Sequence, residues 1–190
     1  MKATFKKLEP GSKINIWILG RKAEAIFEKY IEESGEVTFT HKGRDVTLDV
    51  DMIDKIESTE KVLHLVLMKR WYRMIEAGEK PEEYREFCTY WIKRLCDKAV
   101  FDEEGNRIGR KKITGNFTLN ASRALDLYKA FKDGLMIAKE FDVICFHNGY
   151  TPERMYRRFE GLDAGFGKPE LGAPDGVITF IVKVGSRLER

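Results

Sequence analysis

The chain has 190 residues and is nearly balanced in charge, with 34 Lys and Arg against 31 Asp and Glu, for a formal net charge of +3. Its 43% hydrophobic content and five prolines are typical of a globular protein and exclude collagen-like and disordered chains. No apolar run approaches the ~18 residues of a spanning helix, and no apolar signal segment follows the first residues, so we expect a cytoplasmic protein with no membrane contact.

The first part of the chain is predicted to be a small α+β element. Residues 14–19 form an apolar β-like run, and apolar side chains at spacings of three and four from Ala23 to Ile31 predict a helix that ends at Gly35. Residues 37–50 alternate between apolar and polar around a Lys-Gly pair, which predicts a hairpin. The polar stretch 53–60 is the expected junction to the next domain.

We therefore expect two domains, an N-terminal element over 1–57 of unknown role and a second domain over 61–190. Charge supports this division. Residues 1–60 carry 10 basic and 12 acidic side chains, net −2, and residues 61–190 carry 24 and 19, net +5. The excess of positive charge belongs to the second domain, but it is smaller than in most strong nucleic-acid binders.

Helices and strands alternate irregularly in the second domain, which favours a mixed sheet or small barrel over a doubly wound fold. Helices are predicted over 69–78, over 82–98, and from Asn120 or Ser122 to 139. Strands are predicted over 62–68, 142–147, 155–160 and 177–184, with a charged loop or hairpin over 101–112 and an irregular glycine-rich loop over 161–176. The first and last of these strands are continuous apolar runs and should be buried.

The cysteines and histidines do not predict a metal site. The three cysteines form no CxxC pair and are expected to be reduced: Cys88, Cys96 and Cys145. The three histidines lie in separate strand-like stretches without the Cys/His spacing typical of zinc: His41, His64 and His147. The sequence thus predicts no metal and no cofactor.

One short motif carries chemistry. Gly78-Glu-Lys80-Pro-Glu-Glu83-Tyr-Arg85 follows the pattern GxKxxExR. Lys80 offers a point charge, Arg85 a bidentate fork, and Glu83 an acceptor for the exocyclic amine of a base or a partner for Lys80. If Glu83 and Arg85 begin the predicted helix 82–98, its unpaired N–H groups favour an anionic ligand beside them. A surface salt-bridge cluster is the structural alternative.

The motif resembles that of the ASCH domain family, a PUA-like superfamily, in the form common in bacterial, phage and mobile-element members. Further landmarks follow in the same order, at residues 63–78, Tyr90–Leu95, Phe146–Tyr150, Gly165–Gly172 and Ile178–Gly185. The resemblance covers residues 61–190. It implies an α+β fold, with a PUA-like small mixed β-barrel and flanking helices, to which the N-terminal α+β element is appended.

The resemblance also implies a ligand. We expect RNA or a nucleotide to bind in a basic and aromatic cleft around the motif, and we expect its binding residues to be Lys69, Trp71, Gly78, Lys80, Glu83, Tyr84, Arg85, Asn148 and Tyr150. Aromatic side chains interspersed with Lys and Arg suit stacking on unpaired bases.

Catalysis is the second expectation. Some relatives resembling this chain are small amidohydrolases of acetylated cytidine, or nucleases. In the amidohydrolases the motif is similar to GxKTxTxR, and the threonine stands where this chain has Glu83. The nucleophilic hydroxyl is therefore missing, although Lys80 and Glu83 remain candidates for general acid/base chemistry. A protein-interaction or structural role is the third possibility.

Overall fold

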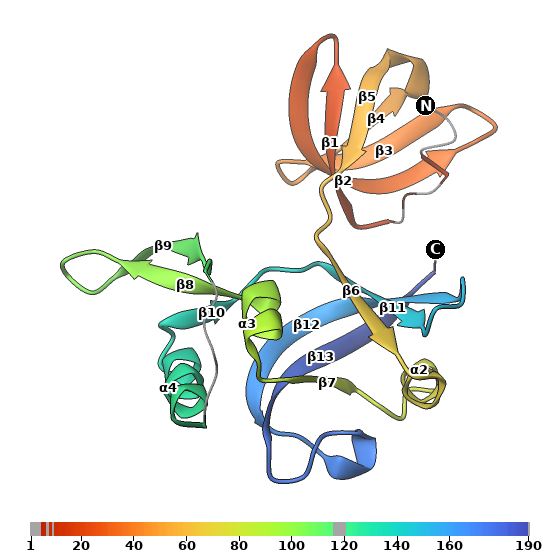
Figure 1. Cartoon of the computed structure of the whole chain (residues 1–190). Helices are drawn as coiled ribbons and strands as arrows, with labels where there is room; N and C mark the ends of the chain where they lie inside the picture. Colours follow the sequence, from red (N-terminus) through yellow and green to blue (C-terminus); the bar gives the residue numbers. More distant parts are fainter. Residues whose placement is uncertain (1–4, 7, 9, 116–120, 190) are drawn as a thin grey trace. The chain divides into compact units, whose positions relative to one another are not determined.

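The computed structural model describes residues 5, 6, 8, 10–115 and 121–189. The chain divides into two compact units, one formed chiefly by the residues up to Val62 and the other by Leu63–Arg187 (Figure 1). Each unit has its own hydrophobic core. Within the described part of the chain, no helix is both long enough and apolar enough to cross a membrane.

The first unit is a five-stranded antiparallel sheet in the order β4-β3-β2-β1-β5. Its strands are β1 (Ser12–Ile18), β2 (Arg21–Ile31), β3 (Glu36–His41), β4 (Arg44–Asp49) and β5 (Ile53–Ser58), and a 3₁₀ turn, η1 (Val50–Met52), precedes the last of them. The predicted strand and the predicted hairpin are both confirmed. The core is built from alternate residues of neighbouring strands, among them Ile14, Ile16, Phe27 and Phe39.

Two predictions for this unit are wrong. The predicted helix from Ala23 to Ile31 is strand β2, because Ala23, Ala25 and Phe27 face the core with period two, while Glu24 and Ile26 between them are exposed. The predicted junction contains β5, which pairs with β1 on the side away from β2. Residues 10–61 therefore contain strands and one 3₁₀ turn but no α-helix, so the expected α+β character is not found there.

The second unit combines two sheets with three helices. Its five-stranded sheet has the order β6-β11-β12-β13-β7, and its smaller sheet has the order β10-β8-β9. The strands are β6 (Val62–Leu67), β7 (Glu82–Glu86), β8 (Cys96–Phe101), β9 (Arg107–Lys112), β10 (Met136–Ala138), β11 (Val143–Asn148), β12 (Arg154–Phe166) and β13 (Ile178–Leu188). The helices are α2 (Lys69–Glu76), α3 (Thr89–Leu95) and α4 (Ala121–Lys132), and a 3₁₀ turn, η2 (Pro169–Leu171), lies between β12 and β13.

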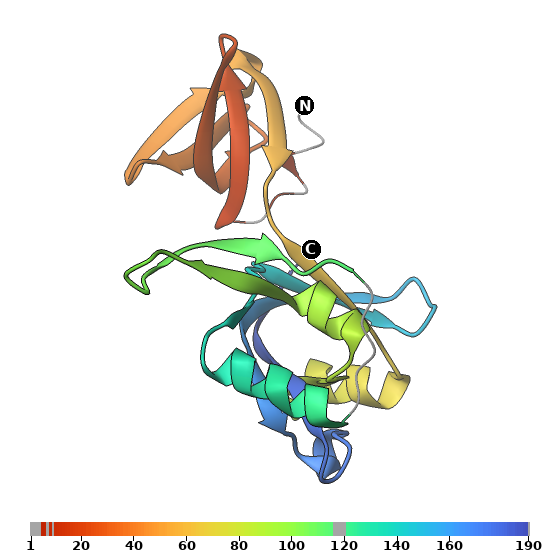
Figure 2. The ribbon, with the colours of Figure 1, turned by 60° about the vertical axis from the view of Figure 1, so that its left-hand side comes forward.

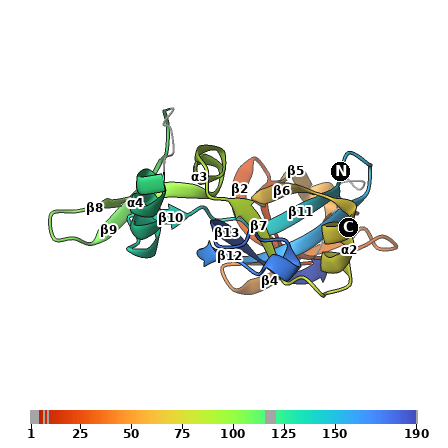
Figure 3. The same cartoon turned by 60° about the horizontal axis from the view of Figure 1, so that its bottom comes forward.

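The smaller sheet extends to one side of the unit. Figures 1 and 3 show the β8–β9 hairpin projecting away from the five-stranded sheet. Helix α4 lies next to β10 and also contacts β12, while α2 contacts β11 (Figure 2). The predicted hairpin over 101–112 is the tip and second strand of this projection.

The helix predicted over 82–98 is wrong in its first half. Residues Glu82–Glu86 form β7, which pairs antiparallel with β13 so that Glu83 lies opposite Val182. Within this range only α3 is helical, and its Trp91, Ile92 and Leu95 pack in the core of the second unit. The third helix ends at Lys132, where the chain continues into β10; Asn120, one of its two expected caps, lies outside the described residues. The expected irregular loop begins later, because β12 extends to Phe166.

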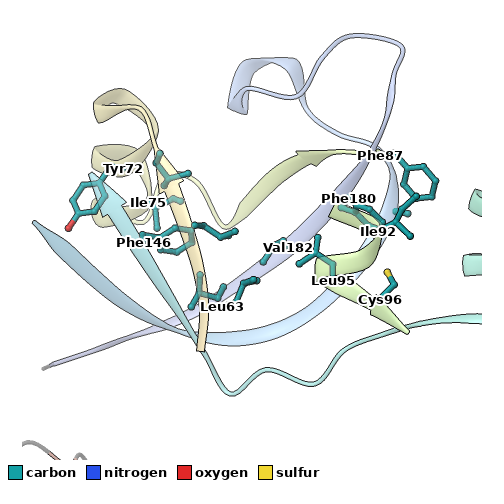
Figure 4. Packing of buried hydrophobic residues seen from close by; sticks show 14 of the residues in the cluster. Leu63, Tyr72, Ile75, Phe87, Ile92, Leu95, Cys96, Phe146, Phe180 and Val182 are labelled. Atoms are coloured by element: carbon teal, nitrogen blue, oxygen red, sulfur yellow. The ribbon is translucent and has the colours of Figure 1, made fainter. Parts of the chain in front are cut away.

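The core of the second unit lies between the large sheet and its helices. Figure 4 shows Tyr72 and Ile75 of α2 beside Phe146, with Phe87, Ile92 and Phe180 clustered toward the other end. The rings of Phe87 and Phe180 are 4.6 Å apart. Strands β6 and β13 are confirmed, but β6 is buried on one face only, since Val66 is exposed while Leu65 is buried.

The described strands do not close into a barrel, because β6 and β7 remain the two edges of the large sheet. Arginine side chains bridge part of this opening. Arg85 donates a hydrogen bond to the Val66 carbonyl at 3.0 Å, and Arg94 of α3 donates one to the His64 carbonyl at 2.8 Å. Both guanidinium groups lie over the ring of Trp91, at 5.0 and 5.7 Å. The mixed α+β class of this unit is thus observed and the expected small barrel is not, while the PUA-like relationship stays a prediction.

Candidate ligand-binding site

The GxKxxExR motif lines a pocket of about 200 Å³ in the second unit. Five segments contribute to it, namely the end of β6, helix α2, the turn between α2 and β7, strand β7 and the loop around η2. The lining residues are Val66, Leu67, Met68, Trp71, Lys80, Glu83, Tyr84, Arg85, Leu171 and Gly172. Five of the expected binding residues therefore meet in one pocket.

A tight turn delivers Lys80 to this pocket. Gly78 ends α2 with a φ of +78°, a backbone conformation that glycine adopts without steric cost. The amides of Glu79 and Lys80 both donate to the Met74 carbonyl, at 2.9 and 3.2 Å. Gly78 is exposed and does not line the pocket, so its role is to shape the turn.

The charged residues of the motif form a buried triad. Lys80 Nζ lies 3.3 Å from Glu83 Oε2, and Arg85 Nη2 lies 3.2 Å from Glu83 Oε1. Lys80 is only 2% exposed and Glu83 5%, and Lys80 also donates a hydrogen bond to the Leu171 carbonyl. The alternative of a surface salt-bridge cluster is therefore wrong about exposure, because two cations surround one carboxylate that is buried.

Burial shifts the pKa of both members of the close pair. It lowers the pKa of Lys80 and raises the pKa of Glu83, and in each case the opposite charge of the partner works against the shift. Among the described residues, no donor makes a well-aligned hydrogen bond to Glu83 Oε2, despite the nearby ammonium of Lys80. A buried carboxylate oxygen without an aligned hydrogen bond is uncommon in proteins, and this one can still accept a hydrogen bond from a ligand.

Two aromatic rings form the walls around Lys80. Its Nζ lies 5.3 Å from the ring centroid of Trp71 and 4.4 Å from that of Tyr84. The Tyr84 hydroxyl donates to Glu82 at 2.8 Å, and burial, followed by this hydrogen bond, raises the pKa of Tyr84 to about 12. The phenol therefore stays protonated at neutral pH.

Glycines of the η2 loop pack directly on these two rings. A Cβ at Gly172 would lie 2.7 Å from the Trp71 ring, and one at Gly167 would lie 2.7 Å from the Tyr84 ring. Contacts that close leave no room for a side chain. The sequence predicted a glycine-rich loop, but nothing in its spacing indicated that Leu171 and Gly172 would complete the pocket.

The remaining expected binding residues lie elsewhere. Lys69 is the exposed first residue of α2 and does not line the pocket. Asn148 is buried at the end of β11 and donates to Glu153, which in turn pairs with Arg73. Tyr150 is fully exposed in the turn that follows. Asn148 and Tyr150 belong to the β11–β12 hairpin, and neither they nor Lys69 line the pocket.

The expected helix N-terminus beside the motif is also absent from the pocket. Glu83 and Arg85 belong to strand β7, where backbone amides are used for pairing with β13. The argument for an anionic ligand at a helix start is therefore wrong for this site. What remains is a small pocket with one carboxylate, two cations and two aromatic walls.

A second group of reactive side chains lies on the large sheet. His64 of β6 and Cys145 and His147 of β11 place their donor atoms within 4.8 Å of one another. Their spacing along the chain does not indicate this contact, because 83 positions separate His64 from His147. These are residues whose donor types suit a transition metal.

Comparison with known proteins adds no relative to this description, since no family model, no curated protein and no solved structure matches the chain.

Proposed function

We propose that the pocket around Lys80, Glu83 and Arg85 binds the base of a nucleotide or of unpaired RNA. The observation that carries the proposal is the buried Glu83 Oε2, which accepts no well-aligned hydrogen bond from the described residues although it lines an aromatic pocket. A ligand N–H group that reached this oxygen would add the aligned hydrogen bond that its ion pair with Lys80 does not supply. The resemblance of the motif to that of ASCH domains supports the same ligand class.

The charges favour a base over a phosphate at the pocket floor. Both cations already face Glu83, and its carboxylate would repel a phosphate brought to the same place. An ammonium has three N–H groups, and Lys80 directs one to Leu171 and lies beside Glu83. A donor and an acceptor therefore lie side by side, and such a pair can hydrogen-bond to the neighbouring acceptor and donor on the edge of a nucleobase.

The aromatic walls supply the test. We expect Trp71→Ala to weaken binding of a mixed-sequence single-stranded RNA or of a mononucleotide by about 5- to 150-fold, because loss of a base–aromatic contact costs ~1–3 kcal/mol. Tyr150→Ala is the matched control, since Tyr150 is fully exposed and lies outside the pocket. Calorimetric titration measures both, and circular dichroism confirms that each variant is folded.

Equal affinities of the wild type and a folded Trp71→Ala variant would contradict the proposal. So would an equal loss in Tyr150→Ala, which would place the nucleic acid on the β11–β12 turn. Because Lys80 is almost fully buried, we expect Lys80→Met to weaken binding by a similar factor at low and high salt. A loss confined to low salt would indicate a phosphate contact at the surface.

A hydrolase is the second candidate, and one observation favours it. Lys80 and Glu83 are 3.3 Å apart, and burial raises the pKa of Glu83 and lowers that of Lys80, the directions in which enzymes tune a carboxylic acid and an amine for acid/base work. None of the described lining residues is Ser, Thr or Cys, so the nucleophile would have to be water.

The two candidates differ in turnover. Incubation with acetylated cytidine and with RNA should release no product if the pocket only binds. Release of product by the wild type, and its loss in a Glu83→Gln variant that keeps its affinity, would establish the hydrolase instead. If pocket variants change stability alone, the triad serves the structure and both proposals fail.

A further inference from the structure

The outer face of strands β6 and β11 carries three side chains that suit a transition-metal ion. We propose that His64, Cys145 and His147 bind one Zn²⁺ ion, with water as the fourth ligand. This site is distinct from the GxKxxExR pocket, with which it shares no residue. The proposal does not depend on what the pocket binds.

The sheet explains why the three side chains meet. Strands β6 and β11 are neighbours in the large sheet, and successive side chains of a strand point to opposite faces. Leu63 and Leu65 of β6, like Ile144 and Phe146 of β11, belong to the core between the sheet and its helices. His64, Cys145 and His147 each follow one of these core residues and therefore point to the opposite face of the sheet, where the neighbouring strands bring them together.

The distances match a tetrahedral zinc centre. His64 Nδ1 lies 3.0 Å from His147 Nε2, and Cys145 Sγ lies 3.6 Å from the same nitrogen. With Zn–N and Zn–S bonds of about 2.05 and 2.3 Å, a tetrahedron separates two nitrogens by about 3.3 Å and a nitrogen from a sulfur by about 3.5 Å. Two of the three ligand separations are thus close to those of a bound ion, and the third, between His64 and Cys145, is within 4.8 Å.

The donor types select the metal. Two imidazoles and a thiolate favour zinc and its neighbours over magnesium or calcium, which prefer oxygen ligands. Cys145 is buried while His64 is exposed, so the protein covers the sulfur and leaves a coordination position open to solvent. A site with three protein ligands and one open position is typical of zinc that holds a water molecule.

Neighbouring charges are compatible with the ion. Arg154 lies opposite His147 in the β11–β12 ladder, but its guanidinium donates to the carbonyls of Thr151 and Glu153 in the turn. The two imidazoles bind the metal in their neutral form. Coordination would exchange the thiol proton of Cys145 for the metal and release that proton to solvent.

A hydrogen-bonded cluster without metal is the rival interpretation, since one neutral imidazole can donate to the other. Cobalt(II) distinguishes the two. The full-length protein, reduced with a phosphine, is titrated with Co²⁺ and followed by absorbance. We expect one equivalent to give intense visible bands of four-coordinate cobalt together with a thiolate-to-cobalt charge-transfer band, and we expect Zn²⁺ to displace it.

Variants locate the ligands. Cys145→Ser should abolish the charge-transfer band, and His64→Gln and His147→Gln should each weaken Zn²⁺ binding by at least about tenfold, as loss of a ligand leaves an incomplete shell. His64→Gln is the decisive variant, because the exposed ring can be replaced without disturbing the core. The matched controls, Cys88→Ser and His41→Gln, should bind the metal like the wild type.

Two results would overturn the proposal. One is a spectrum of six-coordinate cobalt without a charge-transfer band, which would mean that the sulfur is not a ligand. The other is metal binding that persists unchanged in a folded His64→Gln or Cys145→Ser variant, which would place the ion elsewhere on the chain.

Discussion

Replacing Glu83 by Gln removes the only negative charge of the buried triad while keeping the size of the side chain. Lys80 and Arg85 would then face each other across an uncharged amide, with Lys80 almost fully out of water. Loss of one partner from a buried ion pair costs ~3–5 kcal/mol, and the amide oxygen still accepts one hydrogen bond. We therefore expect the free energy of unfolding of the second unit to fall by about 3 kcal/mol at pH 7.

The assay is urea unfolding followed by tryptophan fluorescence. Trp71 and Trp91 belong to the second unit, and a Trp17→Phe background removes the signal of the first, so that one transition is observed. Glu79→Gln is the matched control, because Glu79 is exposed on the same turn and should change stability by less than about 0.5 kcal/mol.

The loss should shrink as the pH rises. In the variant, burial without a counter-charge depresses the pKa of Lys80 below its value in the unfolded chain, so above the depressed pKa the unfolded state binds more protons. Stability then increases with pH until the unfolded pKa is reached. Adding Lys80→Met should restore most of the loss for the same reason. A loss below about 1 kcal/mol, or a double variant as unstable as Glu83→Gln alone, would refute this account of the triad.

Two further substitutions test the pocket wall and the sheet edge. Gly172→Ala should destabilise the second unit by ~1–3 kcal/mol, because the φ of Gly172 is +92°. It should also weaken ligand binding, since the new Cβ displaces Trp71. The control is Gly176→Ala, which has a φ of +66° and open space around it and should lose stability without losing ligand affinity. Equal binding losses in the two variants would contradict the clash. Arg94→Met should lower the free energy of unfolding by ~1–3 kcal/mol, because the His64 carbonyl loses its hydrogen-bond donor. Hydrogen exchange of the β6 amides should accelerate; unchanged exchange would show that water replaces the bond.

Local patterns predicted some of the fold and misled in other places. The alternation of residues 37–50 and the helix that starts at Lys69 were predicted, because in each a single period dominates the sequence. Strand β2 was predicted as a helix, because its apolar residues satisfy both periods and only pairing with β1 and β3 decides between them. Strand β7 was also predicted as helical. Its glutamates have little β preference, and pairing with β13 decides its conformation.

The motif predicted part of the candidate site. Lys80, Glu83 and Arg85 meet as expected because they are close in sequence, and Trp71 joins them through the adjoining helix. Asn148 and Tyr150 were predicted from the resemblance alone and lie outside the pocket. Contacts that depend on the order of strands, such as those of His64 with β11, leave no trace in the spacing of residues along the chain.

The arginines that donate hydrogen bonds to β6, Arg85 of β7 and Arg94 of α3, have a consequence for solubility. An uncovered edge strand is a template on which a second chain can add a strand, and this is a common route to aggregation. Arg85 and Arg94 occupy the carbonyls of Val66 and His64 on that edge, so an incoming strand finds these acceptors already used. Because Arg85 also contacts Glu83 in the pocket, a ligand that drew it inward would uncover one acceptor and make self-association depend on occupancy.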